Sequence, residues 1–139
     1  MNANNYLITK VLNHLTGGAV WTPPTTLYLA LLKTAPVAGD TPSGAGGKEL
    51  VTPTTLDYDR QEITAFTTST GGSSLASNVL LTFGPSTTGW PQAIGAWIVD
   101  SNVEGDGNIW LQGLLVTAKT AGASDSILFA VGEVIFALA

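Results

Sequence analysis

The side chains that could do chemistry are few and lie far apart along the chain. His14 is the only histidine, so a Ser-His-Asp triad or a histidine metal site would have to be built around it. The serines beside glycines, Ser43, Ser73 and Ser86, fall in segments typical of loops, and the sequence contains no G-x-S-x-G elbow. We therefore predict that His14 is a surface residue near a helix C-terminus, where its protonated form meets the helix dipole favourably.

Three carboxylates surround Arg60 in the sequence. Asp57, Asp59 and Glu62 lie close to it, and two such groups could act as general acid and base in glycoside hydrolysis. Catalytic pairs of this kind usually stand in clefts lined by aromatic rings, whereas only Tyr58 is adjacent here. The favoured interpretation is a solvated entrance to a strand with local ion pairs, which contribute little stability when exposed.

The segment from Asp100 to Gly107 resembles the beginning of a calcium loop, because acidic and amide side chains alternate along it. An EF-hand loop also needs a bidentate carboxylate at its twelfth position, and that position is Leu111. Strands rather than helices are predicted on both sides. A hairpin loop rich in Gly and Asp is the better interpretation, since turns favour these residues.

Four tryptophans, Trp21, Trp90, Trp97 and Trp110, could form a platform for carbohydrate. Trp97 and Trp110 fall within strand patterns, where aromatic rings pack across neighbouring strands, so a role in the core or in an interface is favoured. The glycines of segment 44–47 lack the Lys-Ser/Thr and the helix of a phosphate loop. We therefore predict no catalytic residue, no metal site and no cofactor.

The composition limits the function further. The chain has 139 residues and no cysteine, with 5 Lys and Arg against 10 Asp and Glu, which gives a net charge of −5. Direct nucleic-acid binding is not expected, because it depends on basic residues that neutralise phosphates. The apolar runs are far shorter than the ~20 residues that cross a bilayer, so no membrane partner is expected. Only 11% of residues are charged, and the interiors of subunit contacts are depleted of charge in the same way.

One helix is predicted in residues 1–18. An apolar stripe with a period of 3.6 residues, flanked by Asn4 or Asn5 as cap and by Gly17-Gly18 as terminator, predicts a helix from Asn4 to Leu15. This helix is too short to be stable alone, so we expect its stripe to dock on the protomer's own sheet or on a neighbour; the stripe consists of Leu7, Ile8, Val11, Leu12 and Leu15.

The rest of the chain reads as short strands separated by turns. Residues 35–55, rich in Pro, Gly, Thr and Ala, are predicted to form a long surface loop. We predict one domain over residues 1–139, of the all-β class: an antiparallel β-sandwich, jelly-roll-like, with a short N-terminal helix. The predicted strands are 25–33, which is apolar on both faces, 60–68, 78–83, 93–99, 108–117, 126–130 and 133–138.

A series of short motifs spans nearly the whole chain: TLYLALLKTAP, a Gly-rich loop with Glu49, YDRQEITAF, NVLLTF, IGAWIVDS, GNIWLQGLL and GASDSILFAVGEVIFAL. In this order they resemble a family of small bacteriophage virion structural proteins, whose members are often labelled tail-fibre proteins. The resemblance departs at Asp57, where the family has Gly-Gly before the tyrosine, and at Ala123-Ser124, which replace a compact turn. These motifs consist of turns and core positions, so they specify a fold and not a chemistry.

The resemblance implies a non-enzymatic protein of the virion, on the capsid surface or in the tail. We favour a capsid decoration (cement) subunit over a tail or tail-fibre component, because 139 residues without a repeat supply no fibre length. A carbohydrate-binding module is a second alternative, and a hydrolase that uses Asp57 and Asp59 is a distant third.

The expected partners are further copies of the chain, arranged as a homotrimer, and the phage major capsid protein or tail proteins. The residues predicted to lie in interfaces are Leu7, Val11, Leu12, Trp21, Trp97 and Trp110.

Overall fold

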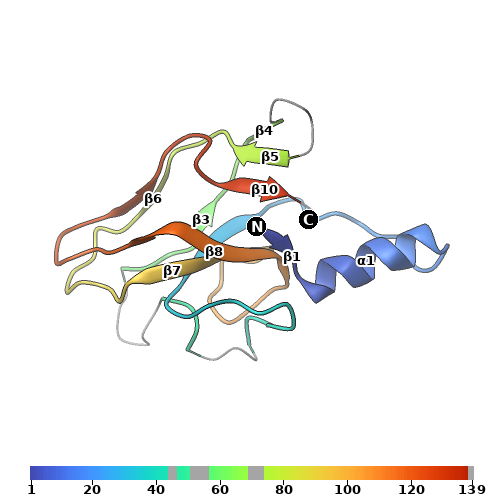
Figure 1. Ribbon diagram of the computed structural model, residues 1–139, viewed down its shortest axis with the longest axis horizontal. Coiled ribbons are helices and arrows are strands. Elements are labelled where there is room, and N and C mark those ends of the chain that lie inside the picture. Colours follow the sequence, from blue (N-terminus) through green and yellow to red (C-terminus); the bar gives the residue numbers. More distant parts are fainter. Residues whose placement is uncertain (44–46, 51–56, 69–73, 138–139) are drawn as a thin grey trace.

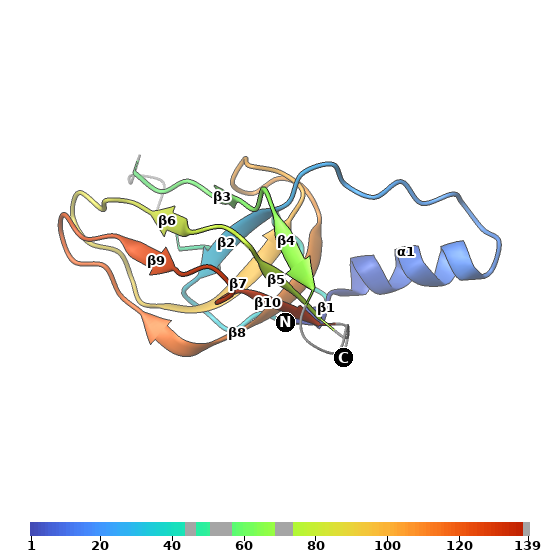
Figure 2. The same cartoon turned by 90° about the horizontal axis from the view of Figure 1, so that it is seen from above.

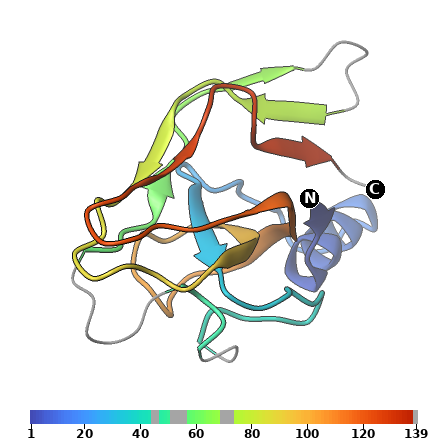
Figure 3. The ribbon, with the colours of Figure 1, turned by 60° about the vertical axis from the view of Figure 1, so that its left-hand side comes forward.

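Two layers of antiparallel strands face each other in the computed structural model, which describes residues 1–43, 47–50, 57–68 and 74–137 (Figures 1 and 3). One layer is a five-stranded sheet in the order β1-β8-β7-β2-β3; the other combines a three-stranded sheet, β10-β5-β4, with the pair β6-β9. The all-β class, the antiparallel sandwich and the short N-terminal helix are therefore confirmed. The elements are β1 (Asn2–Ala3), α1 (Asn5–Leu15), β2 (Tyr28–Leu32), β3 (Gln61–Glu62), β4 (Phe66–Thr68), β5 (Ser74–Ser77), β6 (Leu81–Phe83), β7 (Ala93–Val99), β8 (Ile109–Lys119), β9 (Ile127–Phe129) and β10 (Ile135–Ala137).

The five-stranded sheet is apolar on both faces at its centre. In β2, Leu29 and Leu31 belong to the main core between the layers, whereas Ala30 and Leu32 belong to a second cluster on the opposite face, together with Trp97 of β7. All five side chains are at most 1% exposed. Alternate residues of a strand point to opposite faces, so the unbroken apolar run that predicted a strand buried on both sides is explained and confirmed.

Aromatic rings fill the middle of the main core. Phe83 of β6 lies 5.8 Å from the ring of Tyr58 and 6.1 Å from that of Phe129, measured between ring centroids. Phe83 is fully buried and Phe129 is 3% exposed. Burial of such rings is the main favourable contribution to folding, so these contacts hold the second layer on the first.

The predicted strand over residues 60–68 is in fact two strands that belong to different layers. β3 pairs with β2 in the first sheet, whereas β4 pairs with β5 in the second. Between them the backbone of Ile63 donates to Leu27 O at 2.8 Å, and the Ile63 side chain is buried in the core. The chain thus crosses from one layer to the other at this point. β1 and β5 were not predicted, because two residues and the polar segment Ser-Leu-Ala-Ser carry little strand signal.

The prediction of a long surface loop over residues 35–55 is wrong for part of the segment. Asp40, Glu49 and Leu50 are buried, and Leu50 N donates to Leu31 O at 2.8 Å. Glu49 also forms a β-bridge with Leu32. Glu49 and Leu50 therefore lie against β2, while residues 44–46 and 51–55 of the predicted loop lie outside the described residues.

The ends of α1 are built as the sequence predicted. The Asn4 side chain accepts a hydrogen bond from Tyr6 N at 3.0 Å, and Gly17 follows the helix with a left-handed φ of +72°, a conformation that costs glycine little. No described helix is long and apolar enough to cross a membrane.

The apolar stripe of α1, however, does not dock on the protomer's own sheet as a whole. Leu7 is buried, but Ile8 is 43%, Leu12 54% and Leu15 75% exposed. Figure 2 shows why: α1 projects from one end of the sandwich, and residues 16–27 return along it toward β2. We call α1 and residues 16–27 the arm. Of the two places expected for the stripe, the protomer's own sheet covers only part of it, and docking on a neighbour stays a prediction.

A core truncation tests the packing between the layers. Phe83→Ala removes the ring that contacts Tyr58 and Phe129, so the free energy of unfolding should fall by about 3–5 kcal/mol. Leu128→Ala, at a residue that is 48% exposed on the neighbouring strand, is the control and should cost less than about 1 kcal/mol. Urea unfolding measures both, and equal losses would contradict the position of the core.

Candidate functional site

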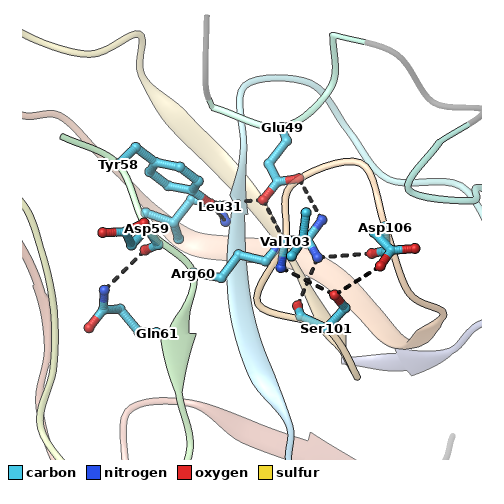
Figure 4. Close-up of polar contacts among 9 residues, drawn as sticks. All are labelled: Leu31, Glu49, Tyr58, Asp59, Arg60, Gln61, Ser101, Val103 and Asp106. Carbon is cyan, nitrogen blue, oxygen red and sulfur yellow. Dashed lines mark hydrogen bonds and ion pairs between the residues drawn. The ribbon is translucent and has the colours of Figure 1, made fainter. Parts of the chain in front are cut away.

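The most densely bonded polar group in the described structure is a buried ion pair between Glu49 and Arg60 (Figure 4). Arg60 Nε lies 2.8 Å from Glu49 Oε1, and Arg60 Nη2 lies 2.9 Å from Oε2. The two residues are only 6% and 5% exposed. This two-pronged geometry is the strong form of a carboxylate–guanidinium contact, so the pair offsets much of the cost of removing its charges from water.

The remaining donors of Arg60 hold the loop between β7 and β8. Arg60 Nη1 donates to the backbone carbonyls of Ser101, at 2.8 Å, and Asp106, at 3.0 Å. The guanidinium group therefore joins three parts of the chain: the segment that contains Glu49, the start of β3, and residues 100–107. Its contacts are structural, and they leave the carboxylate of Glu49 occupied.

Tyr58 completes this buried network. Its hydroxyl group accepts from Leu31 N at 2.8 Å and donates to Glu49 Oε1 at 3.3 Å. Burial, reinforced by the charge of Glu49, raises the pKa of the Tyr58 hydroxyl well above its usual value of 10.0. The hydroxyl stays protonated at neutral pH and acts as a fixed hydrogen-bond bridge between β2 and Glu49.

The prediction of local ion pairs around Arg60 is wrong, because the structure pairs this residue with Glu49. Asp57 instead accepts hydrogen bonds from Thr87 N and, at 3.3 Å, from Trp90 Nε1. The bond from Thr87 is the main cause that lowers the pKa of Asp57. Asp59 and Glu62 are exposed. The carboxylates that suggested an acid–base pair thus lie in different environments, one hydrogen-bonded to the protein and the others exposed to solvent.

Asp100 organises the hairpin loop that the sequence predicted between two strands. Its carboxylate accepts from Asn108 N at 2.7 Å, from Asn108 Nδ2 at 3.0 Å and from Trp110 Nε1 at 3.0 Å. Partial burial alone would raise the pKa of Asp100, but the bonds from Asn108 and Trp110 outweigh it and hold the pKa below 3.8. Within the described residues, no group of three or more His, Asp and Glu side chains is placed to hold a metal ion.

The other sequence candidates also take structural positions. His14 is exposed in the last turn of α1, as predicted. Ser86 is buried, and its hydroxyl accepts from Gly89 N at 2.8 Å. Ser43 is exposed. Ser73 and two of the glycines in the 44–47 segment lie outside the described residues.

The predicted interface residues divide into three groups. Trp97 is 1% exposed inside the protomer, so its side chain fills the core and cannot reach a partner; this placement corrects the sequence analysis. Leu12 lies on the exposed side of α1. The structure brings the other four together, since Leu7, Val11, Trp21 and Trp110 all line one groove.

This apolar groove has a volume of about 520 Å³ and is lined by residues of the arm and of both layers of the sandwich. Trp21 stacks on Trp110 with ring centroids 5.7 Å apart. The rings of Tyr6 and Trp110 are nearly perpendicular, with centroids 5.2 Å apart. Leu75 and Phe136 form the wall contributed by the three-stranded sheet. All lining residues except Ser74 are apolar: Leu7, Val11, Trp21, Pro23, Pro24, Leu27, Leu75, Ile98, Trp110, Leu111, Phe136 and Ala137.

Leu75 and Phe136 were missed as groove residues by the sequence analysis. They lie on strands that are distant in sequence from the arm, and only the pairing of β5 with β10 brings them together. An apolar groove of this size, with no ionisable lining, suits the binding of another apolar surface and not acid–base chemistry.

A family model described as "Podophage GP4 fiber I protein gp80" matches residues 2–137. No curated protein matches the chain.

The buried ion pair supplies a stability test. Glu49→Gln leaves the Arg60 charge buried without its partner charge, so the free energy of unfolding should fall by about 3–5 kcal/mol. Glu133→Gln makes the same chemical change in the outer ion pair of Lys119 and Glu133, where about 0–1 kcal/mol is expected. Chemical denaturation at neutral pH measures both. Equal effects of the two substitutions would show that the Glu49–Arg60 pair does not hold the fold together.

Asp100 supplies a test by pH. Because its pKa is lower in the folded chain than the value of about 3.9 in unfolded chains, its contribution to stability is complete above about pH 5 and is lost as pH falls through the folded pKa. Asp100→Asn removes this titration and leaves those of Asp57 and Glu133 in place. The variant should be less stable at neutral pH and should lose less further stability between about pH 5 and pH 2 than the parent chain. Parallel curves of melting temperature against pH would refute the role given to the Asn108 and Trp110 bonds.

Proposed function

The chain belongs to the family of podophage GP4 fiber I protein gp80, and on this premise we propose that it is a non-enzymatic structural component of the phage tail fibre. The observation that carries the proposal is the extent of the match, which covers residues 2–137 and hence nearly the whole chain. The family places the protein among virion structural proteins. Its description favours the fibre over the capsid decoration that the sequence analysis preferred.

The side chains that suggested catalysis support the non-enzymatic part of this proposal. Asp57 and Asp100, the second of which suggested a cation site, accept hydrogen bonds from donors of the protein itself. Asp59 is exposed, and His14 lies on the projecting helix. Side chains that are hydrogen-bonded in this way hold loops in place, which is the role expected of them in a structural subunit.

The objection that a chain of 139 residues is too short for a fibre is answered by association. If fibre length comes from contacts between copies and with other tail proteins, each copy needs only a rigid body and surfaces that bind. The rigid body corresponds to the sandwich, and the arm and the groove supply such surfaces. We propose a homotrimer as the repeating unit, because cyclic symmetry multiplies a modest contact around one axis.

Electron microscopy of the phage particle tests the location. Particles made without this chain should retain filled heads and lack density for a fibre, and an antibody or tag on the chain should label the tail. Density on the head surface that disappears with the chain would contradict the fibre proposal and favour capsid decoration.

A further inference from the structure

The arm leaves two apolar surfaces of the same chain uncovered. One is the groove, whose floor and walls are apolar side chains from the arm and from both layers. The other is the outer side of α1, where Ile8, Leu12 and Leu15 are 43%, 54% and 75% exposed. A helix of 11 residues is only marginally stable in water without a surface to pack on. A partner that packs against the outer side of α1 would therefore stabilise the helix.

We propose that the outer side of α1 binds in the apolar groove of a second copy of this chain. Ile8, Leu12 and Leu15 follow the spacing i, i+4, i+7, which is the pattern by which an amphipathic helix enters an apolar groove. The inference rests on the fibre function proposed above, because a fibre built from short chains needs a contact that repeats from copy to copy.

Charge supports a second copy as the occupant of the groove. All ten Asp and Glu residues lie between Asp40 and Glu133, whereas the arm carries Lys10 as its one Lys or Arg residue and no carboxylate. The arm therefore has a charge of +1, and the remainder of the chain has −6, from a total of −5. Because the arm carries no carboxylate, none of its side chains is repelled by the negative remainder of a second copy, and its net charge has the opposite sign.

The position of the arm also supports exchange between copies. α1 projects beyond the sandwich (Figure 2). Two of its residues, Leu7 and Val11, already line the groove of their own chain. Ile8, Leu12 and Leu15 of the same stripe do not line that groove, and all three are exposed. The arm can therefore contribute one wall to its own groove and, at the same time, reach a neighbour with its outer side.

Association in solution provides the first test. Leu12→Asp and Leu15→Asp change exposed residues, so the melting temperature of the dissociated chain should remain near that of the parent, while the dissociation constant of the oligomer rises by about tenfold or more. Leu75→Asp should weaken association from the groove side. Val116→Asp is the matched control, because Val116 is a fully exposed apolar residue on β8 that does not line the groove. Native mass spectrometry over a dilution series measures all four.

Cross-linking identifies the surfaces in contact. The chain has no cysteine, so single cysteines can be placed without background. Chains with Ile8→Cys, Leu12→Cys or Leu15→Cys are each mixed with a Leu75→Cys chain and oxidised with diamide. A disulfide forms only where the two Cα atoms approach to about 4.4–6.8 Å, so at least one arm position should give the mixed product. The same arm chains mixed with Val116→Cys should give none.

The outcomes separate this inference from the proposed function. An oligomer that persists in the Asp variants of the arm, without a mixed disulfide from any arm position, would overturn the inference and leave the fibre role standing. A monomeric parent chain whose arm cysteine cross-links to a different virion protein in the particle would overturn the second copy as the occupant. Labelling of the head in electron micrographs would overturn the fibre role itself.

Discussion

The Glu49–Arg60 ion pair is the constraint on which the rest of the structure depends. Burying two charges costs several kcal/mol per ion unless their partners are nearly ideal. Here the two-pronged contact, the Tyr58 hydroxyl and the carbonyls of residues 101 and 106 provide those partners. The network forms only when four parts of the chain are in place: the segment that contains Glu49, the start of β3, strand β2 and the loop between β7 and β8. It therefore selects one arrangement of the first sheet, and this sheet in turn supports both the core and the arm.

The sequence predicts those features whose signal is local. β7 is predicted with its observed bounds, Ala93–Val99, because an unbroken apolar run is typical of a strand covered on both faces. The Asn4 cap and the Gly17 terminator follow from backbone chemistry in the same way. Pairings over long distances leave no such mark. Glu49 lies in a Gly-rich segment, and no neighbouring residue in the sequence indicates that Arg60 is its partner. Trp97 and Trp110 both lie in apolar strand patterns, and only the topology places Trp97 in the core and Trp110 in the groove.

The protein divides into a rigid part and a part that needs a partner. The sandwich is closed by stacked rings and by the buried ion pair, whereas α1 presents a stripe whose members are mostly exposed. The stripe was recognised in the sequence, but an apolar period says only that something covers it and not whether the cover belongs to the same chain. In the fibre role proposed above, this division suits a chain of 139 residues, because the stability of each copy and the binding between copies can be varied separately.

The central claim is that the sandwich is fully packed within one chain, whereas α1 is fully packed only against a second chain. Hydrogen exchange measured over a dilution series tests this claim most directly. The account predicts that amides of β2 and β7 are equally protected in the dissociated and associated states, while amides of α1 gain protection only on association. Full protection of α1 in the dissociated chain would contradict this account, as would exchange in β2 and β7 that depends on association.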